Sequence, residues 1–325
     1  SFLTEIRENT EHVFHVVKSS VLSQQINIQE YPENFTFYNY SKKLSLLRAV
    51  GGKDAFLENI EKRLNPDCIL TIFGPAYWTP KTLHIVGFAD GWCYNPNSIA
   101  FKKLSFADRI KKNLRVSIKN YCIKKEADFI YLETFEAKKK VESTLKLDKT
   151  KVKVIGNTYH SIFNENNLET NKLEQMDIKS LNLITVSANY PHKNLEIIKL
   201  VIPVLLKKKL NVTFYLTLPE EIFKQVFSNY KKWVKNIGPV DIKFVPSLYK
   251  QCDAMFLPTL LETFSASYPE AMKMGKPILT SDLSFSRNIC GTAAEYFNPL
   301  DPEDIALKIE NIINNKKKRD FLVVE

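Results

Sequence analysis

The chain has 325 residues, of which 44% are hydrophobic and 25% are charged, a composition that excludes wholesale disorder and leaves room for two domains with separate cores. No apolar run is long enough to span a bilayer and no signal-peptide pattern is visible, so we expect a cytoplasmic protein. The five cysteines lack a Cys-x-x-Cys pair, which predicts reduced thiols. Neither they nor the five histidines have metal-ligand spacing, so we expect no metal site.

The first half of the chain alternates short apolar runs with helical or loop segments. It opens with a helical pattern over Ser1–Ile6, and we expect the first strand of this domain to be missing from the sequence. Strands are predicted at Phe35–Tyr38, Cys68–Phe73, Leu83–Phe88, Phe129–Leu132 and Lys151–Ile155. A helix is predicted over Ala137–Leu145, and the polar composition of Phe163–Lys179 is typical of a linker or hinge.

A second series of alternating elements follows. Its strands are predicted at Leu181–Ser187, Val212–Leu216, Ile242–Val245, Asp253–Pro258 and Pro277–Thr280. Its helices are predicted to begin at Asn194 and to span Glu220–Val234, Tyr268–Met274 and Pro302–Asn314. Such alternation predicts an α/β fold with parallel sheets covered by helices. We expect two Rossmann-like domains facing each other across a cleft, over residues 1–165 and 166–325.

The net charge of +10 predicts an anionic partner, and the basic residues are concentrated between Phe101 and Lys125, where Asp108 is the single acid. Apolar residues recur there at helical spacing: Leu104, Phe106, Ile110, Leu114, Ile118, Tyr121 and Cys122. We expect this stripe to be buried and the basic face over Lys102–Lys125 to be available to an anionic membrane surface. Nucleic acid is not expected as a partner, because no recognised binding motif accompanies the charge.

The segment Glu262-Thr-Phe-Ser-Ala-Ser-Tyr-Pro-Glu270 places two carboxylates eight positions apart. Glu262 lies on the loop leaving a predicted strand, and Glu270 lies in the first turn of a predicted helix that stops at Gly275. In an open α/β sheet, ligands bind outside the carboxyl ends of the strands. The N–H groups of a helix start favour a diphosphate, and nearby carboxylates suit sugar or ribose hydroxyls. The alternative is that Glu270 only decorates a helix N-terminus.

The segment Tyr190-Pro-His-Lys-Asn-Leu195 follows the first strand of the second series. It places Lys193 at the same predicted sheet edge as the two glutamates, where a cation can neutralise a diphosphate. Asn194 is a candidate N-cap of the next helix. The alternative is an ordinary solvated loop lysine.

Together these motifs resemble the donor-binding domain of retaining glycosyltransferases with the GT-B fold, of the glycosyltransferase family 4 (group 1) kind. The resemblance covers about Leu181–Asn314. The family's strand-proline-lysine-helix pattern is similar to Tyr190–Leu195, and its Glu-x7-Glu signature, followed by Ala-Met and Gly-x-Pro, is similar to Glu262–Pro277. Its Gly-x-Val element resembles Gly238-Pro-Val240, and Lys151–Asn157 is similar to the segment before the family's interdomain hinge.

The resemblance implies a UDP- or GDP-linked sugar donor and neither cofactor nor metal. It implies that Lys193 binds the donor diphosphate, Glu270 the ribose hydroxyls, and Glu262 the donor sugar near the reacting carbon. The other donor-binding candidates are Asn194, Thr263, Phe264, Ser265, Pro239 and Val240. Asp90, at the end of a strand of the N-terminal domain, is the candidate to orient the acceptor hydroxyl; its alternative reading is a turn aspartate before glycine.

The expected reaction is retaining sugar transfer to a glycan or lipid-linked acceptor held by the N-terminal domain, in bacterial surface polysaccharide synthesis. A peripheral position at the inner face of the plasma membrane would fit the basic segment. Two alternatives remain open: a nucleotide-sugar epimerase of similar architecture, and a catalytically weak binding subunit. The second alternative rests on Ala188, where many relatives have an arginine.

Overall fold

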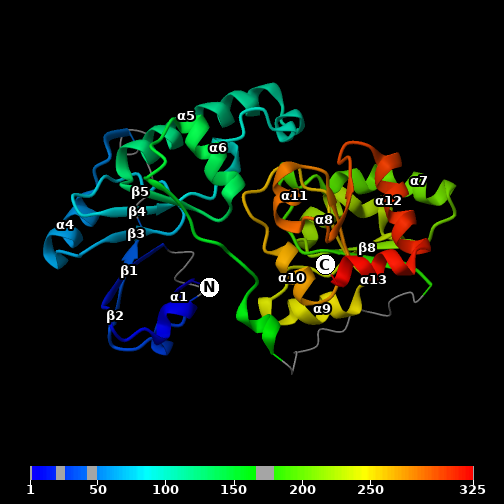
Figure 1. Ribbon diagram of the computed structural model, residues 1–325, viewed down its shortest axis with the longest axis horizontal. Helices are drawn as coiled ribbons and strands as arrows, with labels where there is room; N and C mark the ends of the chain where they lie inside the picture. The colour runs from blue at the N-terminus through cyan, green and yellow to red at the C-terminus, as the bar shows by residue number, and fades with distance from the viewer. Residues whose placement is uncertain (1, 20–25, 42–49, 166–178, 325) are drawn as a thin grey trace. The chain divides into compact units, whose positions relative to one another are not determined.

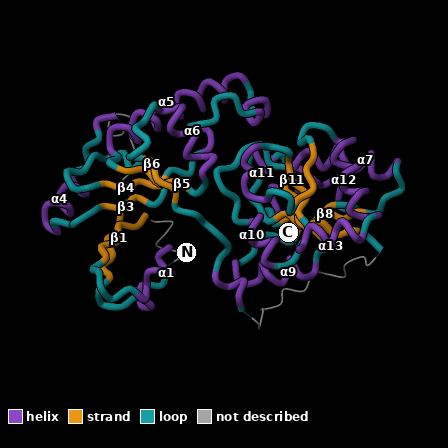
Figure 2. Tube along the Cα trace, viewed as in Figure 1, coloured by secondary structure: helices purple, strands orange, loops and turns teal. Residues whose placement is uncertain are grey.

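The computed structural model describes residues 2–19, 26–41, 50–165 and 179–324. The chain divides into two compact units, Ser1–Gly51 and Gly52–Glu325, and Figures 1 and 2 label many of their elements. The expected domain boundary at residue 165 adjoins a segment outside the described residues and stays a prediction.

The first unit contains a short helix, α1 (Phe2–Glu5), and a two-stranded parallel sheet of β1 (Phe14–Ser19) and β2 (Phe35–Tyr40). Phe14 and Phe35 are register partners, and their rings stack with centroids 4.6 Å apart. The strand predicted at Phe35–Tyr38 is confirmed. The sequence does not predict β1, in which polar residues interrupt the apolar ones.

The second unit begins with a parallel sheet in the order β3-β4-β5-β6. Its strands are β3 (Ile69–Thr71), β4 (His84–Gly87), β5 (Phe129–Leu132) and β6 (Val152–Val154). The accompanying helices are α4 (Ala55–Leu64), α5 (Phe106–Glu126) and α6 (Phe135–Leu145). Val86 and Ile130 of the sheet form a buried cluster with Ile123 of α5 and Val141 of α6. All four predicted strands are therefore confirmed, with shorter bounds for three of them.

The larger sheet of this unit has parallel strands in the order β12-β11-β10-β7-β8-β9. They are β7 (Leu181–Thr185), β8 (Val212–Leu216), β9 (Val234–Asn236), β10 (Ala254–Leu257), β11 (Ile278–Ser281) and β12 (Ala294–Phe297). The helices are α7 (Ile198–Lys207), α8 (Glu220–Phe227), α9 (Val245–Gln251), α10 (Ser267–Lys273), α11 (Ser284–Cys290), α12 (Pro302–Asn314) and α13 (Lys316–Val324).

Both faces of the larger sheet are covered by helices (Figure 1), because successive residues of its central strands are apolar. Leu183, Phe214 and Phe256 pack with α7, α8 and α12 on one face. Their chain neighbours Ile184 and Tyr215 pack with α9, α10 and α11 on the other. The run of apolar residues in each central strand thus follows from burial on two sides.

Two predictions in the middle of this series are wrong. The helix predicted over Glu220–Val234 ends at Phe227, and Val234 instead begins β9, where it is fully buried and paired with Phe214. The segment predicted as a strand at Ile242–Val245 is a 3-10 turn leading into α9. Asp241 caps this turn by accepting a hydrogen bond from Lys243 N. Short apolar runs do not distinguish a strand from a buried helix start.

Two burial predictions are also corrected. Phe163, expected at the start of a linker, is buried beside Tyr249 in the core under α9, whereas residues 166–178 of that linker lie outside the described residues. The apolar stripe expected to be buried is buried only in part: Cys122 is buried, and Leu104 and Ile118 are half-buried. Its other members are exposed: Phe106 by 82%, Ile110 by 54%, Leu114 by 61% and Tyr121 by 50%. All five cysteines are free thiols, as predicted.

Phe256→Ala is expected to destabilise the second unit by about 3–5 kcal/mol, because Phe256 is fully buried and packs on Phe214 and Phe297. Urea unfolding followed by circular dichroism measures the change. Leu200→Ala, at a position 59% exposed on α7, is the matched control and should cost less than about 1 kcal/mol. Equal losses for both variants would contradict this packing.

Candidate functional site

The two motifs singled out in the sequence meet at the carboxyl edge of the larger sheet. Lys193 ends a 3-10 turn after β7, and Glu262 lies in the loop after β10. Lys193 Nζ lies 2.6 Å from Glu262 Oε1, and the side chains are only 16% and 9% exposed. Because strands β7 and β10 are parallel neighbours, their following loops leave the sheet side by side. A cation and a carboxylate are thus held together in a largely desolvated place.

Backbone contacts tie these two loops to each other. The carbonyl of His192 accepts hydrogen bonds from Leu260 N at 2.7 Å and from Thr259 Oγ1 at 3.2 Å. Lys193 N donates to the carbonyl of Tyr190 at 2.8 Å. The position of the lysine is therefore set by main-chain geometry as well as by its ion pair.

Glu270 lies in the first turn of α10, as predicted, and is 7% exposed. Burial raises the pKa of its carboxyl to about 7, and the hydroxyl of Tyr249 lies 3.4 Å from Oε2. The helix ends as predicted: Gly275 has φ +60° and its N–H donates to the Met272 carbonyl. The local sequence thus fixes where the second carboxylate of the motif lies.

Asp90 follows β4 in the smaller sheet and begins a 3-10 turn, accepting a hydrogen bond from Trp92 N. Its Oδ2 lies 2.5 Å from Nζ of Lys119, which comes from α5. Burial alone would lower the pKa of Lys119, but the hydrogen bond and the charge of Asp90 raise it. Lys119 therefore stays a cation beside this carboxylate.

A small pocket of about 150 Å³ brings Asp90 and Glu262 together. Its walls are Ala89, Asp90, Gly91, Trp92, His192, Leu261, Glu262 and Thr263. A side chain in place of the hydrogen at Gly91 would begin 3.2 Å from Leu261 Cγ, so only glycine allows this approach without displacement. Carboxylates from the smaller and the larger sheet thus line one space.

His192 is a residue of this pocket that the sequence analysis passed over. Its ring stacks on Tyr190, with centroids 5.6 Å apart, and meets Trp92 edge-on at 5.8 Å. Burial, with the charges of Lys193 and Lys112, lowers its pKa to about 4. The imidazole is therefore neutral at neutral pH. The sequence feature that could have identified His192 as a site residue is its position directly before Lys193 in the same loop.

The remaining predicted donor residues lie around this core. Thr263 lines the pocket and Ser265 is buried, with its carbonyl accepting from Tyr268 N. Phe264 lies between them, half-buried. Pro239 is exposed, and Val240 packs against the core cluster that includes residues of α9, α10 and α11, so neither residue is a wall of the pocket.

Asn194 does not cap the helix that follows it, contrary to the prediction. It adopts φ +55°, and its side chain makes no capping hydrogen bond. Its Nδ2 donates instead to the Pro299 carbonyl at 2.8 Å, and the residue is 4% exposed. Asn194 therefore ties the lysine loop to the loop after β12.

Glu133 is a third carboxylate that the sequence analysis missed. It follows β5 directly, accepts from Asn157 Nδ2 at 2.5 Å, and lies 3.5 Å from Thr263 Oγ1. Burial raises the pKa of this carboxyl. The rule that selected Asp90, an acid at the carboxyl end of a strand, also applies to Glu133.

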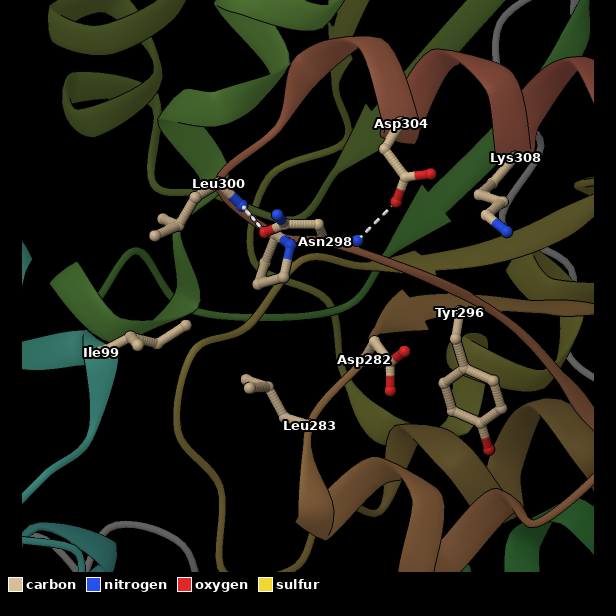
Figure 3. Close-up of a pocket in the computed structure, with 9 residues that line it drawn as sticks. Ile99, Asp282, Leu283, Tyr296, Asn298, Leu300, Asp304 and Lys308 are labelled. Carbon is tan, nitrogen blue, oxygen red and sulfur yellow. Dashed lines mark hydrogen bonds between the residues drawn. The ribbon is translucent and has the colours of Figure 1, made fainter.

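A second cavity, of about 380 Å³, lies beyond the ends of β11 and β12 (Figure 3). Its polar groups are already paired: Asp304 accepts from Asn298 N at 2.7 Å, and Asn298 Oδ1 accepts from Leu300 N at 3.1 Å. Asp282 forms two hydrogen bonds with Arg287. None of the predicted site residues lines this cavity.

Within the described ranges, no cluster of three or more His, Cys, Asp or Glu side chains has the geometry of a metal site. Among the helices in those same ranges, none has both the length and the apolar character needed to cross a bilayer.

Residues 180–315 match the family model described as glycosyl transferases group 1. WaaG, a glycosyltransferase involved in lipopolysaccharide biosynthesis, superposes with a TM-score of 0.65 at 14% identity, over 90% of this chain and 81% of its own. The fold is GT-B. Anabaena Alr3699/HepE, solved with UDP and glucose, gives 0.64 at 15% identity over 94% of this chain and 84% of its own.

A glycosyltransferase from Rickettsia africae ESF-5 gives a TM-score of 0.64 at 13% identity, over 97% of this chain and 92% of its own. No curated protein sequence matches the chain significantly. The predicted α/β fold with two Rossmann-like domains is thus confirmed, and the matched segment, which contains Lys193, Glu262 and Glu270, supports a glycosyltransferase.

Glu270→Gln is expected to flatten the dependence of stability on pH. The pKa of this carboxyl rises from 4.5 to about 7 on folding, so its stabilising contribution is full below pH 4.5 and is lost as the pH rises through 7. The loss amounts to roughly 3 kcal/mol in the wild type and is absent in the neutral glutamine variant.

Urea unfolding of both proteins across this pH range measures the difference. Glu303→Gln, which changes an exposed carboxylate, is the control and should follow the wild type. Parallel profiles for the wild type and Glu270→Gln would show that Glu270 does not titrate this way.

Proposed function

We propose that this protein transfers a sugar, with retention of configuration, from a UDP- or GDP-linked donor to a glycan or lipid-linked acceptor. The observation that carries the proposal is the Lys193–Glu262 pair beside Asp90, in a segment that matches group 1 glycosyltransferases. A cytoplasmic site and a role in bacterial surface polysaccharide synthesis belong to the same proposal. WaaG, of similar fold, is a glycosyltransferase of lipopolysaccharide biosynthesis.

In the proposed complex, Lys193 binds the donor diphosphate. Its ammonium group is desolvated and held by one carboxylate, so a diphosphate placed there would interact with it more strongly than in water. Backbone N–H groups of Phe264 and Ser265 complete the diphosphate site, and no metal is required for charge neutralisation. Glu270 accepts hydrogen bonds from the ribose hydroxyls, and Pro239 and Val240 border the base.

The reacting end of the donor would lie in the 150 Å³ pocket, which is smaller than the roughly 300–1,000 Å³ typical of small-molecule sites. It fits one sugar and leaves the nucleotide outside. As the bond between the anomeric carbon and the diphosphate oxygen breaks, negative charge grows on the leaving group and Lys193 stabilises it. Glu262 faces the positive charge that develops on the sugar.

The acceptor oxygen attacks from the side that the diphosphate leaves, which retains the configuration. The acceptor proton passes to a phosphate oxygen of the leaving nucleotide, so no separate protein base is needed. Asp90, fixed by Lys119, orients the acceptor hydroxyl, and the neutral His192 presents its ring to the same space.

Ala188 favours a second candidate, a binding subunit with weak activity, because the arginine of many relatives is absent there. Nucleotide binding without turnover would support it. A donor converted to its epimer without any acceptor would support the epimerase alternative instead.

Calorimetric titration with UDP and GDP tests the donor site. One nucleotide should bind, and Lys193→Ala and Glu270→Ala should each weaken it by about 10- to 100-fold, as expected for lost hydrogen bonds to charged groups. Lys199→Ala is the matched control, since Lys199 pairs with Glu196 on the surface nearby. If neither nucleotide binds, or if the two variants bind like the wild type, the proposed donor site is wrong.

A further inference from the structure

The exposed face of α5 is the largest departure from the sequence analysis. Four large apolar side chains along this helix are solvent-exposed: Phe106 by 82%, Ile110 by 54%, Leu114 by 61% and Tyr121 by 50%. At 3.6 residues per turn they lie within an arc of about 80° and extend along roughly 22 Å of helix. They therefore form an apolar stripe on one face of the helix, in which the exposed Ser117 is a polar residue, unlike the isolated exposed apolar residues that are normal on protein surfaces.

The opposite face of the same helix is the one that folds onto the protein. Ile123 is fully buried there in the core cluster of the smaller sheet. Lys119 binds Asp90, and the Nζ of Lys112 lies 4.7 Å from the ring centroid of Trp92. The inward side of α5 is thus satisfied without the stripe, so the stripe contributes nothing to this core.

Basic side chains border the stripe on both edges. At 100° per residue, Arg109 lies about 60° beyond one edge of it and Lys111 about 60° beyond the other, and Arg115 lies about 40° further round than Lys111. The exposed basic residues of this region are Lys102, Lys103, Arg109, Lys111, Arg115, Lys124 and Lys125. Asp108 is the single acid between Phe101 and Lys125, and Ser105 Oγ binds it in the N-cap.

We propose that α5 binds an anionic lipid bilayer, lying in the plane of the interface with Phe106, Ile110, Leu114 and Tyr121 inserted below the headgroups. Charge complementarity selects this occupant, because an apolar strip flanked by cations matches acyl chains beneath a layer of negative headgroups. An apolar protein groove would match the strip but not the basic residues at both of its edges.

The same helix connects the bilayer to the candidate site. Lys112 and Lys119 lie roughly half a turn of helix away from the stripe, on the side that faces Trp92 and Asp90. A helix is about 10 Å across, so docking of α5 would hold the Asp90 pocket close to the headgroup layer. An acceptor carried by a membrane lipid could then reach Asp90 without leaving the bilayer.

Vesicle co-flotation of the full chain tests this surface, in the absence of nucleotide and acceptor so that failure of the proposed sugar transfer does not affect the result. The chain should bind vesicles that contain phosphatidylglycerol and not vesicles of phosphatidylcholine alone. Lys111→Glu with Arg115→Glu should weaken binding at least about 25-fold, since each basic residue near an anionic surface contributes about fivefold. Ile110→Ser with Leu114→Ser should weaken it at least about tenfold.

Matched controls change similar side chains away from α5. Leu200→Ser with Leu307→Ser replaces residues that are 59% and 45% exposed, and Lys207→Glu with Lys235→Glu reverses two exposed lysines; both variants should bind vesicles like the wild type. Circular dichroism confirms that each variant is folded.

Insertion has its own readout. In Leu114→Trp, the new indole should shift its emission to the blue on binding and be quenched by brominated acyl chains. Three results would each overturn the proposal. The first is no binding to anionic vesicles, and the second is an equal loss of vesicle affinity in the α5 and control variants. The third is binding to heparin as tight as binding to vesicles, with an indole at position 114 that brominated acyl chains do not quench. The last outcome would identify a site for soluble polyanions.

Discussion

The parallel arrangement of the larger sheet is the constraint on which the site depends. Because every strand runs in the same direction, the loops after β7 and β10 leave at one edge, and residues 69 positions apart in sequence meet there as the Lys193–Glu262 pair. The strands can be parallel because both faces of the sheet are buried under helices. The core of this domain and its charged site are consequences of the same topology.

The candidate site contains several carboxylates, which would repel an anionic donor if their charges were not neutralised. In the structure, two of them are paired with lysines. Glu262 is paired with Lys193 and Asp90 with Lys119, while burial leaves Glu270 close to half-protonated at neutral pH. The site thus presents less negative charge than its sequence indicates. A diphosphate entering it would compete with Glu262 for the lysine, and Glu262 is then the carboxylate that repels it.

The sequence predicted the elements whose patterns were long or distinctive, and the residues of the two motifs. Gly275 marked the end of α10, and the run Val212–Leu216 marked β8 with its bounds. The sequence could not place Val234 in a strand, because a short amphipathic stretch fits both the helical and the strand period. It also could not predict the exposure of Phe106, because a helical apolar stripe has the same sequence pattern whether protein or lipid covers it. Glu133 and His192 each had a sequence signal, a strand end and the position before Lys193, but only the tertiary contacts show that they lie at the site.

The most direct test of the account is the affinity of Glu262→Gln for the nucleoside diphosphate that the wild type binds. If Glu262 pairs with Lys193 until the diphosphate replaces it as the lysine's partner, removing the carboxylate charge leaves the lysine free to bind the diphosphate. The substitution also removes the repulsion between Glu262 and the diphosphate. The variant should then bind the diphosphate as tightly as the wild type or more tightly, while sugar transfer is lost. Binding weakened as much as in Lys193→Ala would contradict the exchange of partners and the donor site built on it.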